Sequence, residues 1–218
     1  MVKRIKTKNA FTLAEVLITL VIIGVVAALT IPTAINKYKE QELKSQFKKA
    51  YSIIKQAIYK TEMYDFQGYA ACYYGIGVSS NVTGCHSFFS HLANNLSLQK
   101  VCNNHSLSQG CIPVYQSYPT SEGCAGFGEY NLNNYYKTYV LADGQIFIPY
   151  GGGQMPLFLI DINGHKGPNA SGKDVFLFHL KRDVTEFYLE GSADMSCFPV
   201  VSGGRTTAQM IQYALIKK

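Results

Sequence analysis

The sequence predicts an α+β fold in which one long N-terminal helix, membrane-spanning and then amphipathic, packs on a C-terminal antiparallel meander sheet. Three observations predict it. An apolar run occupies residues 11–31, a helical repeat of apolar residues follows it to residue 62, and short strand-like segments separated by turns occupy residues 136–189. The 218 residues suffice for one such helix and one globular domain of ordinary size.

The apolar run extends from Phe11 to Ile31 with a single charge, and about 20 residues are enough to span a bilayer as a helix. Basic residues precede it in a short leader, which the positive-inside rule places in the cytoplasm, although Lys37 and Lys39 follow the run and weaken that signal. A secretory signal has small residues after its apolar stretch, whereas the small Ala10 lies before this one. Cleavage after Ala10 therefore leaves the helix on the mature protein.

The single charge within the run is Glu15. A carboxylate in a membrane helix costs about 2.5–3.5 kcal/mol on insertion scales, so it needs either water or a cation. One interpretation places Glu15 at the hydrated interface. The other pairs it with the Phe11 amine of a neighbouring subunit, created by cleavage after Ala10, because no Lys or Arg of the run can serve.

The segment Ala10-Phe11-Thr12-Leu13-Ala14-Glu15-Val16, behind its basic leader, resembles the cleavage and methylation signal of type IV prepilins and type II secretion pseudopilins. The resemblance implies cleavage between Ala10 and Phe11 by a membrane aspartyl prepilin peptidase, followed by N-methylation of Phe11. It also implies that Glu15 neutralises the Phe11 amine of an adjacent subunit during assembly. The family most often has Gly before the cut, and Ala10 departs from that. Strong similarity covers roughly residues 8–60 and is architectural beyond them.

Gly24 and Pro32 are the weak points of the apolar helix, and we count them with Phe11 and Glu15 among the assembly residues. Pro32 removes a backbone donor and crowds the carbonyl of Ala28, and Gly has low helix propensity. In the resembled family, a stretch bounded by such a Gly and Pro can lose helical order inside the filament. The other interpretation is a kink where the helix leaves the membrane.

The helical pattern continues over residues 33–62, where apolar residues recur at steps of three and four between charged ones. We predict one continuous amphipathic helix whose apolar stripe packs on a sheet, since the stripe is too short to favour a coiled coil. The predicted division is a cytoplasmic leader over residues 1–10, a membrane and assembly helix over 11–32, and a pilin-like globular domain over 33–218.

Within the globular domain, residues 63–135 are rich in Gly, Asn, Ser, Tyr and Cys, and apart from a short helix at 87–98 they are predicted to be loops. The sheet is expected over residues 136–189, with strands at 136–142, 145–150, 157–162, 175–180 and 184–189. Asp143-Gly144 is a strong hairpin signal between the first two. In the C-terminal segment 190–218, we expect a helix over 206–216.

Six cysteines are expected to form disulfides, because a domain beyond a membrane anchor lies in an oxidising space. The sequence leaves the pairing open, and we favour the mostly local set Cys72–Cys85, Cys102–Cys111 and Cys124–Cys197. A zinc site is the alternative, but the spacing of its candidate ligands fits no standard pattern. Those candidates are Cys85, His86, His91, Cys102, His105 and Cys111.

Residues 161–174 are the candidate metal loop, in which Asp161, Asn163 and Asp174 offer the oxygen ligands that Ca²⁺ prefers. The loop begins like an EF-hand, but His165 replaces an acidic ligand and Gly172 stands at the twelfth position. Some major pseudopilins of the resembled family bind calcium in a loop between late strands. The favoured alternative is a rigid turn without metal, in which Asp and Asn bond their own backbone. No other cofactor is expected.

No catalytic motif is present: the chain has no GxSxG, HExxH, P-loop or CxxC, and its histidines are scattered. The net charge of +6 predicts no partner either, because it falls to +2 without the four leader cations. We therefore predict a structural subunit rather than an enzyme.

The predicted role is that of a pilin or pseudopilin in a type IV pilus or type II secretion filament, polymerised through its N-terminal helix. Expected partners are copies of itself, other pilins or pseudopilins, the prepilin peptidase and an inner-membrane assembly platform. The chain is expected to be a single-pass membrane protein with its globular domain outside the cytoplasm, and then part of a periplasmic or extracellular filament. The alternative is a minor tip subunit acting as an adhesin or DNA-binding module. Residues 63–135 lack Tyr interleaved with Lys or Arg, which counts against nucleic acid.

Overall fold

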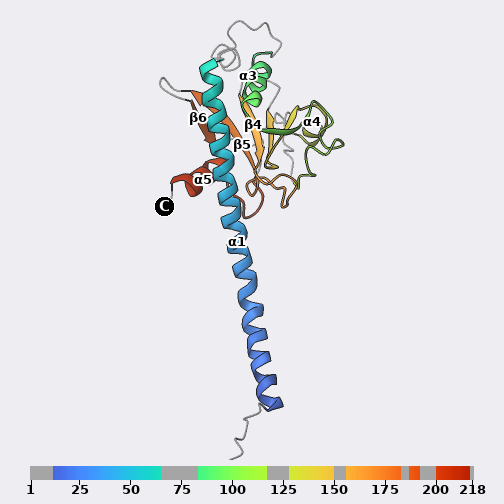
Figure 1. Cartoon of the computed structure of the whole chain (residues 1–218), viewed down its shortest axis with the longest axis vertical. Helices are drawn as coiled ribbons and strands as arrows, with labels where there is room; N and C mark the ends of the chain where they lie inside the picture. Colours follow the sequence, from blue (N-terminus) through green and yellow to red (C-terminus); the bar gives the residue numbers. More distant parts are fainter. Residues whose placement is uncertain are drawn as a thin grey trace, which may run out of the picture. The chain divides into compact units, whose positions relative to one another are not determined.

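The computed structural model describes residues 12–64, 83–116, 128–149, 156–182, 187–191 and 200–216 (Figure 1). The chain divides into two compact units, Met1–Glu42 and Leu43–Lys218. It is an α+β protein in which a long N-terminal helix precedes an antiparallel sheet, as the sequence predicts.

Helix α1 (Leu13–Tyr64) is continuous over 52 residues and passes through both Gly24 and Pro32. Its first part exposes apolar side chains, and it is the one helix among the described residues that is long and apolar enough to cross a membrane. Two hydroxyls in this part form hydrogen bonds within the helix. Thr19 Oγ1 donates to the Val16 carbonyl and Thr30 Oγ1 donates to the Val26 carbonyl, each at 2.9 Å.

The sheet is a six-stranded antiparallel meander in the order β1-β2-β3-β4-β5-β6, of which Figure 1 labels β4, β5 and β6. Its strands are β1 (Leu98–Cys102), β2 (Thr138–Leu141), β3 (Ile146–Pro149), β4 (Leu157–Asp161), β5 (Val175–Arg182) and β6 (Phe187–Gly191). The five predicted strands are present, and residues 184–186 of the last prediction lie outside the described residues. Strand β1 is an addition, in a region that the sequence predicted to be loops.

The shorter helices are α3 (Thr83–Asn94), α4 (Glu129–Asn134), α5 (Thr207–Ile211) and the π-helix η2 (Gln212–Ile216). The predicted helix at 87–98 is confirmed in kind but ends at Asn94, where the Asn95 and Leu96 amides donate to carbonyls three residues back. The predicted C-terminal helix is confirmed, and Thr206 and Gln209 form a capping box at its start. Helix α4 was not predicted.

One face of the sheet shares an apolar core with the second part of α1. Phe47 is fully buried, and its ring centroid lies 4.9 Å from that of Phe176 and 5.9 Å from that of Phe178. Helix α3 contributes Phe89, whose ring lies 6.0 Å from that of Phe147. The prediction that the amphipathic stripe packs on the sheet is confirmed, because its buried members belong to this core: Phe47, Ala50, Ile54 and Ile58.

The opposite face of the sheet is buried as well, and the sequence analysis did not predict this. Alternate side chains of a strand point to opposite faces, so the neighbours of the first core residues form a second cluster. The strand members of that cluster are Ile146, Ile148, Leu157, Leu159, Val175 and Leu177. They pack against Ile112, Tyr115 and Leu132, which come from the segment after β1 and from α4. Part of the predicted loop region is therefore a packed layer.

Candidate functional site

The start of α1 is a capping box formed by Thr12 and Glu15. The Thr12 amide and hydroxyl both donate to Glu15 Oε2 at 2.8 Å, and the Glu15 amide donates to Thr12 Oγ1 at 3.3 Å. This arrangement satisfies helix N–H groups that have no partner within the helix. The sequence analysis missed it, although Thr-x-x-Glu is its recognised signature.

Glu15 pairs with no cation among the described residues, and its carboxylate is exposed. Ala10 and Phe11, the proposed cleavage and methylation residues, lie outside the described residues. Pairing of Glu15 with the Phe11 amine of another subunit therefore stays a prediction. The capping box adds that the carboxylate is held at the helix start by its own chain.

Gly24 and Pro32 lie on the exposed, apolar part of α1. A Cβ built on Gly24 meets no atom within 4 Å, so the single chain gives no packing reason for glycine there. The helix is intact at both positions, which leaves order loss in a filament as a prediction. The side chains around them are exposed, among them Val21, Ile23 and Leu29.

The candidate metal loop at residues 161–174 is built on two buried carboxylates. Asp161 Oδ1 accepts the backbone amides of Asn163 at 3.2 Å and Gly164 at 2.8 Å. Asp174 Oδ1 and Oδ2 accept the amides of Ala170 and Asn169, each at 2.7 Å. Three of the four carboxylate oxygens thus accept backbone N–H groups. The bonds of Asp161 have the geometry of an Asx turn, whereas Asp174 accepts from residues that precede it in the loop.

Burial raises the pKa of the Asp161 carboxyl well above its ordinary value, and the charge of Asp174 adds to the effect. Burial also raises the pKa of Asp174, against the backbone hydrogen bonds that lower it. A calcium ion takes six to eight oxygen ligands, and three of the four carboxylate oxygens are already engaged. No group of three His, Cys, Asp or Glu side chains suited to a metal occurs in the described part of the chain. The donor set fits a rigid turn better than a calcium site, and calcium on Asp161, Asn163 and Asp174 stays a prediction.

The same loop holds other segments in place. A Cβ on Gly164 would come within 2.1 Å of the Gly144 carbonyl oxygen in the β2–β3 turn, so only glycine allows this close approach. The Arg205 amide donates to the Gly172 carbonyl at 2.7 Å, which ties the C-terminal segment to the loop. His165 Nε2 lies 3.2 Å from the Gly110 carbonyl oxygen. The loop therefore contacts the β2–β3 turn, the C-terminal segment and Gly110.

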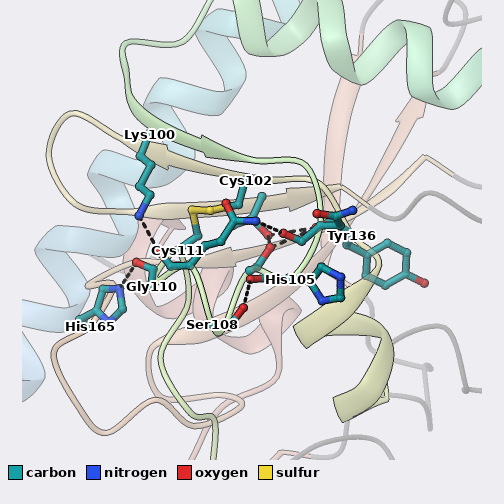
Figure 2. The surroundings of a disulfide bond; sticks show 12 residues. Lys100, Cys102, His105, Ser108, Gly110, Cys111, Tyr136 and His165 are labelled. Carbon is teal, nitrogen blue, oxygen red and sulfur yellow. Dashed lines mark hydrogen bonds between the residues drawn. A yellow bond between two sulfur atoms is a disulfide. The ribbon is translucent and has the colours of Figure 1, made fainter.

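A disulfide joins Cys102, at the end of β1, to Cys111, and both residues are fully buried (Figure 2). Figure 2 shows the loop that this disulfide closes. The Lys100 ammonium donates to the Gln109 carbonyl, and the His165 ring lies against the Gly110 carbonyl. The predicted Cys102–Cys111 pairing is present. Because these two sulfurs are bonded to each other, the alternative zinc site that included them is wrong.

The remaining cysteines give no further test of the predicted pairing. Cys72, Cys124 and Cys197 lie outside the described residues, as does the side chain of Cys85. Cys72–Cys85 and Cys124–Cys197 stay predictions.

Comparison with known proteins identifies the N-terminal part of the chain. The family model described as the prokaryotic N-terminal methylation motif matches residues 5–31, and this motif is the signal of type IV pilins and pseudopilins. No curated protein and no solved structure matches the chain. The match covers part of the predicted leader and the apolar part of α1, so it says nothing of residues 32–218.

Proposed function

We propose that this chain, which carries the pilin-type signal, is a structural subunit of a type IV pilus or a type II secretion filament that polymerises through α1. The observation that carries the proposal is the methylation motif on a helix whose apolar side chains are exposed while one carboxylate, Glu15, stands at its start. Exposed apolar surface on this scale needs either lipid or neighbouring helices. The membrane surrounds the helix with lipid in the anchored precursor, and the filament core surrounds it with neighbouring helices after assembly.

In this proposal, cleavage after Ala10 creates the Phe11 amine, which is then methylated. When a subunit leaves the bilayer, its Glu15 carboxylate approaches the Phe11 amine of a neighbour, and each charge compensates the other away from water. The capping box with Thr12 holds the carboxylate at the helix start and so restricts where the amine must be placed.

The test is Glu15→Gln, expressed as the only copy of the protein. Gln at this position preserves a capping box with Thr12, so the substitution removes the charge and leaves the helix start in place. Losing one partner of a desolvated ion pair costs about 3–5 kcal/mol, so we expect sheared filaments to fall below detection while leader removal and membrane content stay normal.

Two matched variants complete the experiment. Glu42→Gln removes a carboxylate from an exposed site on the same helix, and Thr12→Ala breaks the cap but keeps the Glu15 charge. Both are expected to assemble, the second with a helix start weakened by about 1 kcal/mol. A normal filament yield for Glu15→Gln would show that Glu15 is only a hydrated interface residue.

A further inference from the structure

One surface of the globular domain has no role in the proposed assembly. It consists of the disulfide-closed loop Cys102–Cys111 and helix α4 with the adjoining Tyr135, and we refer to it as the loop–α4 surface. Leu132, on the inner side of α4, belongs to the same buried cluster as Ile112 just after the loop. The loop and the helix are thus parts of one packed layer.

Two tyrosines on this surface are exposed to solvent. Tyr130 is 65% exposed and Tyr135 is 62% exposed, and their rings lie 5.4 Å apart at an interplanar angle of 76°. Large aromatic side chains usually bury their rings, and an exposed edge-to-face pair offers apolar ring surface beside polar hydroxyls. Exposed aromatic groups of this kind are enriched where proteins bind other molecules.

The polar part of the surface carries almost no charge. From Val101 to Gln116 there is no Asp, Glu, Lys or Arg, and α4 adds only Glu129. The exposed side chains of the loop are amides, a hydroxyl and an imidazole, namely Asn103, Asn104, His105, Ser108 and Gln109. Exposed positions of α1 in the same unit are basic by comparison, with Lys48, Lys49 and Lys60.

Backbone hydrogen bonds hold the loop to α4. The His105 amide donates to the Asn134 carbonyl at 3.0 Å, and His105 Nδ1 lies 3.2 Å from Asn134 Oδ1. Ser106 Oγ donates to Thr138 Oγ1 of β2 at 2.8 Å. His105 has a φ of 49°, a left-handed conformation that is uncommon for a non-glycine residue, and these hydrogen bonds hold it there. The surface is therefore ordered before any partner arrives, which lowers the entropic cost of binding.

We propose that the loop–α4 surface binds a neutral oligosaccharide. The C–H face of a sugar ring stacks on an exposed aromatic ring, and its hydroxyls both donate to and accept from amides and hydroxyls, which matches the two tyrosines and the uncharged loop. Nucleic acids and acidic glycans require cations, whereas the residues of this surface carry no Lys or Arg and the adjacent Lys100 ammonium is engaged with the Gln109 carbonyl. This binding activity goes beyond the filament role and does not depend on it.

The experiment uses the full chain in lipid nanodiscs, which avoids sugar-based detergents. The protein is applied to an array of neutral oligosaccharides, sialylated and sulfated oligosaccharides, and single-stranded DNA. We expect saturable binding to a subset of the neutral oligosaccharides only. Tyr130→Ala and Tyr135→Ala should each weaken it about tenfold or more, as removal of an aromatic anchor does.

Tyr59→Ala is the matched control, because Tyr59 is an exposed tyrosine of α1 outside the loop–α4 surface, and it should bind like the parent protein. Tyr130→Phe keeps the ring and should retain most of the binding, whereas a variant that merely misfolds would lose it. Three results would overturn the proposal: binding to none of the neutral oligosaccharides, binding only to acidic glycans or DNA, or equal losses in Tyr59→Ala. Self-association abolished by the Tyr130 and Tyr135 changes, without sugar binding, would overturn it as well.

Discussion

At the scale of single residues, we expect two neighbouring carboxyl groups, Asp161 and Asp174, to make stability depend on pH. Asp161 and Asp174 are both fully buried, and burial raises the pKa of each, well above its ordinary value for Asp161. A carboxyl whose pKa is higher in the folded than in the unfolded state stabilises the fold when protonated. Its contribution is fully present below the unfolded pKa of about 4 and is lost as the pH rises through the folded pKa.

Asp161→Asn should therefore flatten the fall in the free energy of unfolding as the pH rises above about 4. The amide oxygen still accepts the Asn163 and Gly164 N–H groups, so at neutral pH the variant should be at least as stable as the parent. Asp161→Ala leaves both N–H groups without this acceptor and should be about 1–3 kcal/mol less stable than Asp161→Asn. Urea unfolding between about pH 4 and 8, with a chelator present, measures these differences.

Two controls keep this prediction specific. Glu129→Gln removes an exposed carboxylate from α4 and should leave the pH profile unchanged. Repeating the series with millimolar Ca²⁺ tests the predicted calcium site on Asp161, Asn163 and Asp174. A Ca²⁺-dependent stabilisation that disappears in Asp161→Asn would contradict the rigid-turn interpretation.

At the scale of helices and strands, the sequence predicted elements with a clear repeat and missed elements without one. Helix α1 and strands β2 to β5 follow from apolar periodicity and from the Asp143-Gly144 turn. Strand β1 has an irregular register between Leu98 and Lys100 and only one buried residue, so no alternation marks it. Helix α4 has six residues, too few for a helical repeat.

The burial of the second face of the sheet also has a signal in the sequence, which the sequence analysis did not use. Ile-Phe-Ile-Pro in β3 and Leu-Phe-Leu-Ile in β4 are continuous apolar runs, and every residue of both strands is buried. Such runs are typical of strands covered on both faces. The sequence does not show which segment provides the cover, because residues 103–116 have no periodicity and are held by the disulfide and backbone hydrogen bonds.

The candidate site was predicted in part as well. The apolar run and Glu15 led to the pilin-type signal, which the family model matches, because each motif residue is local in sequence. The capping box also has a local signature, Thr12-x-x-Glu15, which the sequence analysis did not use. The loop–α4 surface depends on tyrosines brought beside a distant loop by packing, which local patterns do not reveal.

The core between α1 and the sheet should be sensitive to loss of volume. Phe47→Ala removes a fully buried ring that contacts Phe176 and Phe178, and large-to-small changes of this type cost about 3–5 kcal/mol. Lys48→Ala, at the exposed next position, should change stability by less than about 0.5 kcal/mol. Denaturant unfolding followed by near-ultraviolet circular dichroism measures both. Equal, small effects would contradict the packing of α1 on the sheet.

At the scale of the whole molecule, one helix has two environments. Its apolar side chains are exposed in the first unit, from Leu13 to Ile35, and buried in the second, from Phe47 to Ile58. The buried part is satisfied within the chain by the sheet. The exposed part needs lipid or other subunits, and this need is the physical basis of the proposed filament role.

The intact mass of the protein isolated from its native host tests this account most directly. A filament subunit of this type must keep the apolar helix and lose only the leader. We expect the mass of residues 11–218 with one added methyl group, and an N-terminal peptide that begins with N-methylated Phe11. A mature chain that begins after Ile31, or a full-length chain that keeps its leader in the filament fraction, would contradict the central claim.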